Sequence, residues 1–68
     1  MTAQEQIAAV EQLFKENYKM LKQAKTESYA NRMRSVITGI VLSLDALQVP
    51  EAREYSLMQE VKADLGIE

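Results

Sequence analysis

The segment from Met33 to Leu47, with the sequence MRSVITGIVLSLDAL, is the most apolar part of this chain of 68 residues and constrains its fold most strongly. Its large apolar residues recur at the three- and four-residue intervals of an α-helix and do not alternate strictly, as they would in a half-buried strand. The β-branched residues would also suit a strand, but the sequence has no second strand-like run to pair with it. The pattern predicts a helix over about residues 27–47 with an apolar face made of Tyr29, Met33, Val36, Ile37, Ile40, Val41, Leu44 and Leu47.

The N-terminal part of the chain predicts a second amphipathic helix over about residues 3–24. Thr2 and Glu5 have the spacing of a capping box at its start. On a helical projection the lysines at positions 15, 19 and 22 fall on the side opposite to the apolar residues. The apolar sector consists of Ala3, Val10, Leu13, Phe14, Met20, Leu21 and Ala24, with Ile7 and Tyr18 at its edge.

The four residues between Ala24 and Tyr29 contain neither glycine nor proline, so one continuous helix must be weighed against two. On a single helix the two apolar sectors would differ in direction by about 135°, which is more than a gently curved helix can absorb against one core. Thr26 is a good N-cap residue, and Glu27 would favour the N-terminus of a helix. We therefore expect a short turn near residues 25–28.

The C-terminal part predicts a third helix over about residues 50–64. Val49 precedes Pro50 and is thereby pushed out of the helical region, while Pro50 suits the first position of a new helix. Gly66 is a suitable C-terminal stop. The apolar stripe of this helix, Leu57, Met58, Val61 and Leu65 with Tyr55 at the edge, is narrow, which predicts an outer and more weakly held element.

Together these patterns predict a single all-α domain over residues 1–68, either a small three-helix bundle or a helical hairpin plus a third helix. We expect the helix over 27–47 to be central, because its packable surface covers about 260° of its circumference. Two neighbouring helices of one short chain would not cover so much surface. Completion by dimerisation is therefore expected.

The small size supports the same expectation. A single core of this size rarely supplies more than about 3–5 kcal/mol without an additional device. The sequence has no cysteine and no histidine, which removes disulfides and the usual zinc ligands. The first residues do not resemble a signal peptide, and polar residues interrupt the apolar run before it could span a membrane. We expect a cytoplasmic homo-oligomer that does not associate with membranes.

Asn17 is the one polar residue near the middle of the apolar sector of the first helix. A buried amide needs hydrogen-bond partners. Three interpretations follow: a local hydrogen bond or partial exposure at a helix crossing, a contact with its own copy that fixes the register of an assembly, or a ligand-binding role. We retain Asn17 as a candidate self-association residue.

A line of small residues follows one side of the helix over 27–47. Ser35, Gly39 and Ser43 are spaced by four residues, with Ala46 close to the line and Leu42 beside it. Small residues at this spacing let two helix backbones approach closely, and a helix-interior glycine costs about 1 kcal/mol relative to alanine. Either a second helix packs on this line, or Gly39 is merely tolerated and the serines are solvated.

The sequence offers little for catalysis. Without histidine or cysteine there is no Ser–His or Cys–His pair, and no glycine-rich loop is present to hold phosphates. The carboxylate pairs Glu51/Glu54 and Glu60/Asp64 lack the histidines of di-metal bundles and are expected to form a solvated acidic face. We expect no enzyme activity, no cofactor, no metal and no small-molecule substrate.

Charge is unevenly distributed. Residues 15–34 carry six basic and two acidic side chains, whereas the rest of the chain carries two basic and eight acidic ones. Either the acidic third helix or a symmetry mate balances this basic middle, or the basic side chains contact nucleic acid. The candidate nucleic-acid contacts are Lys15, Lys19, Lys22, Arg32 and Arg34.

The function expected from the sequence is thus a non-catalytic helical protein–protein interaction or assembly module, such as a homodimeric small regulator or adaptor, with a further protein partner possible in principle. The alternative is a small nucleic-acid-binding regulator.

Overall fold

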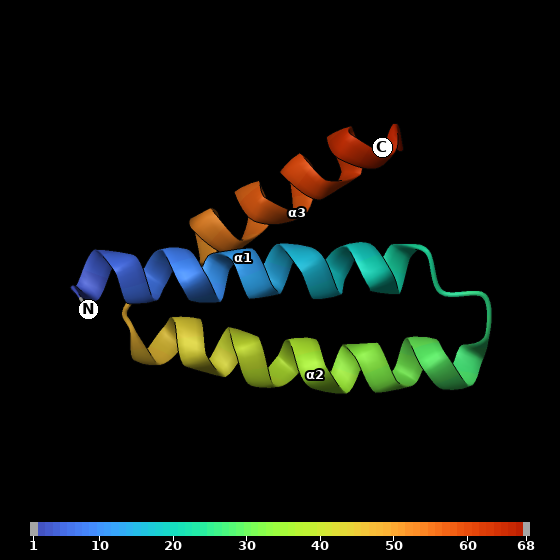
Figure 1. Cartoon of the computed structure of the whole chain (residues 1–68), viewed down its shortest axis with the longest axis horizontal. Helices are drawn as coiled ribbons and strands as arrows, with labels where there is room; N and C mark the ends of the chain where they lie inside the picture. Colours follow the sequence, from blue (N-terminus) through green and yellow to red (C-terminus); the bar gives the residue numbers. More distant parts are fainter. Residues whose placement is uncertain (1, 68) are drawn as a thin grey trace.

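A computed structural model describes residues 2–67 as three helices, α1 (Ala3–Lys22), α2 (Glu27–Ala46) and α3 (Glu51–Leu65). The helices account for most of the chain, and residues 2–67 contain no strand. The predicted all-α class is confirmed, and so is the helical conformation of the apolar segment over 33–46. In Figure 1, α1 and α2 form an antiparallel hairpin, and α3 runs at an angle to α1.

Threonine side chains cap the first two helices. The backbone N–H of Glu5 donates to Thr2 Oγ1 at 3.1 Å, and the N–H of Tyr29 donates to Thr26 Oγ1 at 3.2 Å. Each bond satisfies one of the donors that a helix N-terminus leaves without an intrahelical partner. The capping at Thr26 confirms that the chain breaks into two helices, with a linker over residues 23–26. The first helix ends two residues earlier than expected.

α2 and α3 end in the same way. At the end of α2, the N–H of Gln48 donates to Asp45 O, and the N–H of Val49 donates to Leu44 O, both at 3.0 Å. The backbone of Gln48 adopts the left-handed conformation, with φ of 63°. This is the Schellman pattern, in which Val49 also contacts the buried Leu44 in the core.

Gly66 occupies the matching left-handed position after α3, with φ of 71°. Its N–H donates to Ala63 O at 3.1 Å, and the N–H of Ile67 donates to Lys62 O at 2.9 Å. The expected glycine stop is confirmed. α3 begins at Glu51, and Pro50 is the N-cap residue that precedes it, one position away from its predicted place.

The central helix is α1, not α2. α1 packs against both α2 and α3, whereas α2 and α3 make few direct contacts with each other (Figure 1). The expectation that the helix over 27–47 lies centrally is therefore wrong. Phe14 and Tyr18 of α1 stack with ring centroids 5.9 Å apart and are both buried. They belong to the core cluster, whose buried members are Phe14, Tyr18, Leu44, Val49, Leu57 and Val61.

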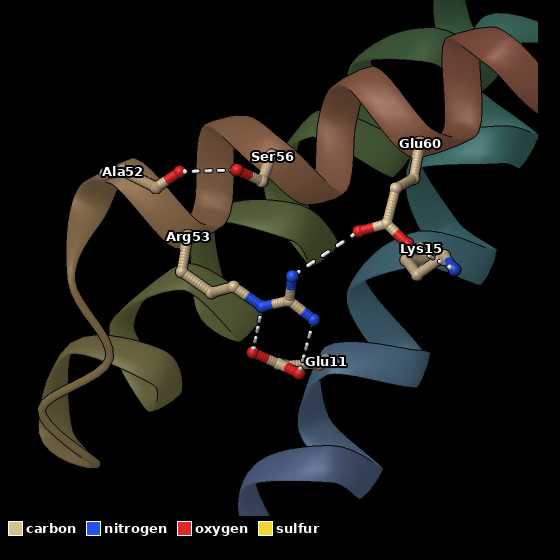
Figure 2. Close-up of polar contacts among 6 residues, drawn as sticks. All are labelled: Glu11, Lys15, Ala52, Arg53, Ser56 and Glu60. Atoms are coloured by element: carbon tan, nitrogen blue, oxygen red, sulfur yellow. Dashed lines mark hydrogen bonds and ion pairs between the residues drawn. The ribbon is translucent and has the colours of Figure 1, made fainter.

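α3 is held against a flank of α1 that the sequence presents as polar. Its buried Leu57 and Val61, only 1% and 2% exposed, supply the apolar contact. Figure 2 shows the polar part, in which the Arg53 guanidinium donates two hydrogen bonds to the Glu11 carboxylate, at 2.9 and 3.2 Å. Glu60 of α3 lies 3.5 Å from both Arg53 and Lys15. These ion pairs attach the third helix to α1.

Candidate functional site

The α1/α2 hairpin has a groove on each side. On one side a cleft of about 340 Å³ is lined by residues of all three helices, and we refer to it as the covered cleft. On the other side a shallow groove of about 430 Å³ is lined only by α1 and α2. A helical projection puts the residues that line the two grooves on opposite sides of α2, whereas on α1 the two sets are centred only about 90° apart.

The side of the hairpin without α3 carries most of the exposed large apolar residues of α1 and α2. Leu13, Met20, Tyr29 and Val36 are 42–49% exposed, and their positions project to the same side as the shallow groove. The two residues from each helix are seven positions apart and so lie in one stripe. We define the open face as these four residues together with the groove residues Gln6, Ala9, Val10, Ser43, Ala46 and Leu47. These residues are uncharged, but the exposed Arg32, four positions before Val36, projects between Val36 and Ala46.

Asn17 lies half-buried on α1 between the positions of Leu13 and Met20. Its amide nitrogen donates to the backbone carbonyl of Leu13 at 2.8 Å. The local hydrogen bond, one of the three interpretations drawn from the sequence, is therefore present. The amide oxygen is left for another donor, so a register-fixing role in an assembly stays a prediction.

The line of small residues on α2 lies at the edge of the open face. Ser43 and Ala46 line the shallow groove, and among the described residues no atom outside the local backbone of α2 and the chain neighbours of Gly39 lies within 4 Å of a Cβ placed on Gly39. The hydroxyls of Ser35 and Ser43 donate to the backbone carbonyls of Asn31 and Gly39, both at 3.2 Å. This satisfies their hydroxyl protons within the helix.

Leu42, which we grouped with this line, lies further round α2. It is the most exposed of the large apolar residues at 64%, and it projects about 120° away from Val36. Ser43 and Ala46 thus line the groove of the open face, whereas Leu42 lies outside the groove, about 40° beyond Ala46 on α2.

The covered cleft has apolar walls and one buried acid. Six of its lining residues are apolar or aromatic, namely Phe14, Tyr18, Leu21, Ile37, Val41 and Met58. Its polar residues are Arg34, Thr38 and Glu54. The Thr38 hydroxyl donates to the backbone carbonyl of Arg34 at 2.9 Å.

Glu54 corrects the expectation of a solvated acidic face. The residue is only 8% exposed, and among residues 2–67 its buried Oε1 atom accepts no hydrogen bond. Burial raises the pKa of its carboxyl above the ordinary range. The charge of Asp45, a hydrogen bond that the protonated Glu54 shares with Asp45, and the charge of Glu51 raise this pKa further.

Of the basic residues proposed as nucleic-acid contacts, the three lysines lie on one side of α1, where Lys15 and Lys19 line a common groove, whereas the two arginines lie on α2. Lys15 pairs with Glu60, and Lys22 Nζ lies 5.2 Å from the centre of the Tyr18 ring. Arg34 bonds Asn31 at 2.7 Å and lies 3.5 Å from Glu27. Arg32 and Arg34 are two residues apart and project to nearly opposite sides of α2. Lys19 is exposed on α1. Nucleic-acid binding stays a prediction with less support than the open face.

Two further findings concern the chemistry available to residues 2–67. In this part of the chain no three acidic side chains come close enough together to hold a metal ion. None of its helices combines the length and the apolar character that crossing a membrane requires.

Comparisons of the chain with protein-family models, with curated proteins and with solved structures gave no match. A proposal about its function therefore depends on the geometry above.

Proposed function

We propose that this chain is a non-catalytic assembly module that forms a homodimer by packing two open faces against each other. The observation that carries the proposal is the uncharged stripe of Leu13, Met20, Tyr29 and Val36, which α3 leaves uncovered. Contiguous exposed apolar surface on a small domain is typical of an interaction site. Packing two hairpins face to face would give a four-helix arrangement, with both copies of α3 on the outside.

The size of the open face suits such an interface. A helix of 20 residues is about 30 Å long, and two helices packed about 10 Å apart present a face about 20 Å wide. The face then offers about 600 Å² per copy, or about 1,200 Å² in a dimer, at the lower end of stable specific interfaces.

The chemistry of the face favours a second copy of the same chain. A two-fold interface brings identical patches together, so any charged residue near its axis would meet its own like charge. The stripe itself is uncharged, whereas Arg32 projects among the α2 residues of the face, so the two-fold axis of the proposed dimer lies over the α1 side of the face, away from Arg32. Gln6, Asn17 and Ser43 supply neutral polar groups that can bond in either direction across such an interface.

The small residues at the edge of the face give Gly39 a role. The structure provides no contact within the chain that would compensate the helix-destabilising effect of Gly39, because the space beside it is open among the described residues. In the proposed dimer a helix of the partner copy approaches α2 along Gly39, Ser43 and Ala46.

The test is the mass in solution, with one disruptive variant and one matched control. Light scattering at about 10–100 µM, where moderately stable dimers form, should give twice the 7.7 kDa of one chain. Val36→Glu should give the monomer mass with the helical circular dichroism retained, because the interface would have to bury two added carboxylates in place of two apolar side chains. Leu42→Glu, on the same helix but outside the open face, should leave the dimer intact.

A monomer mass for the unmodified chain would refute the proposal. So would a dimer that Leu42→Glu disrupts and Val36→Glu leaves intact, since this result would place self-association on a different side of α2.

A further inference from the structure

The covered cleft contains a buried carboxylate oxygen that accepts no hydrogen bond from the described residues. Glu54 lines the cleft, and its Oε1 atom is buried without a hydrogen-bond partner among the described residues. Buried polar groups are nearly always hydrogen-bonded, so an exception of this kind calls for an explanation. The cleft that leads to Glu54 offers one, because it could admit a donor that the protein lacks.

The charges around Glu54 specify the sign of that donor. The charges that act on the Glu54 carboxyl belong to two acids, Asp45 on α2 and Glu51 on α3. The basic residue of the cleft, Arg34, lies eleven residues before Asp45, which corresponds to about 16 Å along α2. Its guanidinium is already bonded to Asn31 and pairs with Glu27. Among the described residues, no basic side chain forms an ion pair with Glu54 at its end of the cleft.

The rest of the cleft specifies an apolar body. Phe14, Ile37 and Met58 belong to the walls between the helices, and the volume of about 340 Å³ lies at the small end of ligand-binding pockets. A positively charged ligand group would stabilise the buried carboxylate. A hydrocarbon or aromatic ligand group would displace water from the apolar walls.

The geometry points to a binding site for a small organic amine, with the protonated amino group beside Glu54 and its hydrocarbon or aromatic body along the apolar walls of the covered cleft. This inference is independent of the proposed dimer, because the cleft and the open face lie on opposite sides of α2.

The probe is n-hexylamine, and n-hexanol is its matched neutral control with the same hydrocarbon chain. Methionine methyl groups labelled with ¹³C give separate signals for the two sides of the hairpin, since Met58 lines the cleft and Met20 lies on the open face. Hexylamine should shift the Met58 signal saturably and leave the Met20 signal in place. Hexanol should bind at least about 10-fold more weakly, as expected for loss of a charge-assisted hydrogen bond.

Glu54→Gln should weaken hexylamine binding by about 10-fold or more and leave hexanol binding unchanged. The comparison of amine with alcohol uses the unmodified chain, so the test does not depend on how this variant folds. The inference is wrong if hexylamine gives no saturable Met58 shift, if hexanol binds equally well, or if Met20 responds in place of Met58. Retention of full hexylamine affinity by Glu54→Gln, with its circular dichroism unchanged, would also overturn it.

Discussion

Replacing Glu54 by glutamine should stabilise the free protein at neutral pH. Glu54 is 8% exposed, and its Oε1 atom accepts no hydrogen bond among residues 2–67. At neutral pH an ionised Glu54 would place a negative charge close to Asp45 and Glu51. Glutamine has nearly the same shape but no charge, and its amide can donate to the Asp45 carboxylate.

The magnitude follows from the cost of burying a charged group without a partner, which is at least the cost for a neutral group, about 1–3 kcal/mol. Glutamine removes the cost of the charge, although its own carbonyl oxygen stays buried. Part of the cost in the unmodified chain is relieved by protonation, since burial and Asp45 raise the pKa of Glu54. We therefore expect Glu54→Gln to gain about 1–2 kcal/mol at pH 7, within that range. For a domain of this size such a gain raises the melting temperature by about 4–8 °C per kcal/mol.

The effect should depend on pH in one direction. Because the pKa of Glu54 is raised on folding, the protonated carboxyl favours the folded state, and this contribution is complete below the ordinary carboxyl pKa of about 4.5. It is lost as the pH rises through the raised value. The advantage of Glu54→Gln should thus be largest at neutral pH and small near pH 4.

Urea unfolding followed by circular dichroism measures the free energy of unfolding at each pH, for the variant and the unmodified chain. The control is Glu51→Gln, which also removes an acid from α3. Glu51 is exposed in the first turn of the helix, where a negative charge is stabilised by the helix dipole, so its removal should not increase the free energy of unfolding comparably. The reasoning would be refuted if Glu54→Gln were no more stable at pH 7, or if its advantage persisted undiminished at pH 4.

Three further substitutions test the fold. Gln48→Gly should stabilise the protein by about 0.5–1 kcal/mol in urea unfolding, because it relieves the left-handed φ of 63° at a small entropic cost; an unchanged midpoint would contradict this. Leu44→Ala, at a residue with 0% exposure, should cost about 2–5 kcal/mol, and the cooperative thermal transition should be largely lost. Arg53→Lys cannot keep both hydrogen bonds to Glu11, so it should lower the melting temperature at low salt, and the difference should shrink near 1 M salt.

The features predictable from the sequence are those set within one or two helical turns. The threonine caps at positions 2 and 26, the glycine stop at 66 and the periodicity of each helix depend on neighbouring residues, and all were found as expected. The linker over residues 23–26 has no glycine or proline, yet the mismatch in helical phase was sufficient to predict it.

The packing order could not be predicted, because it depends on contacts between residues far apart in the chain. The polar flank of α1 looks like a solvated surface, but Glu11 is covered by Arg53, which lies 42 residues away. The same reasoning assigned Leu13 and Met20 to the buried sector, although α2 leaves both about half exposed.

Glu54 was missed for a different reason. It was paired with Glu51 as part of an acidic face, but it precedes Leu57 by three residues and Val61 by seven, which puts it in the apolar stripe of α3. This spacing is the signal that could have identified it.

The two proposed surfaces share α1 and α2 but lie on opposite sides of α2, which leads to a last prediction. If the hairpin behaves as a rigid unit, occupation of the covered cleft should not alter self-association. The dissociation constant of hexylamine, measured from the Met58 methyl signal, should be the same in the unmodified chain and in Val36→Glu. A change of more than about 5-fold would correspond to about 1 kcal/mol of coupling. It would mean that the spacing of α1 and α2 differs between monomer and dimer, so that one side of the hairpin controls the other.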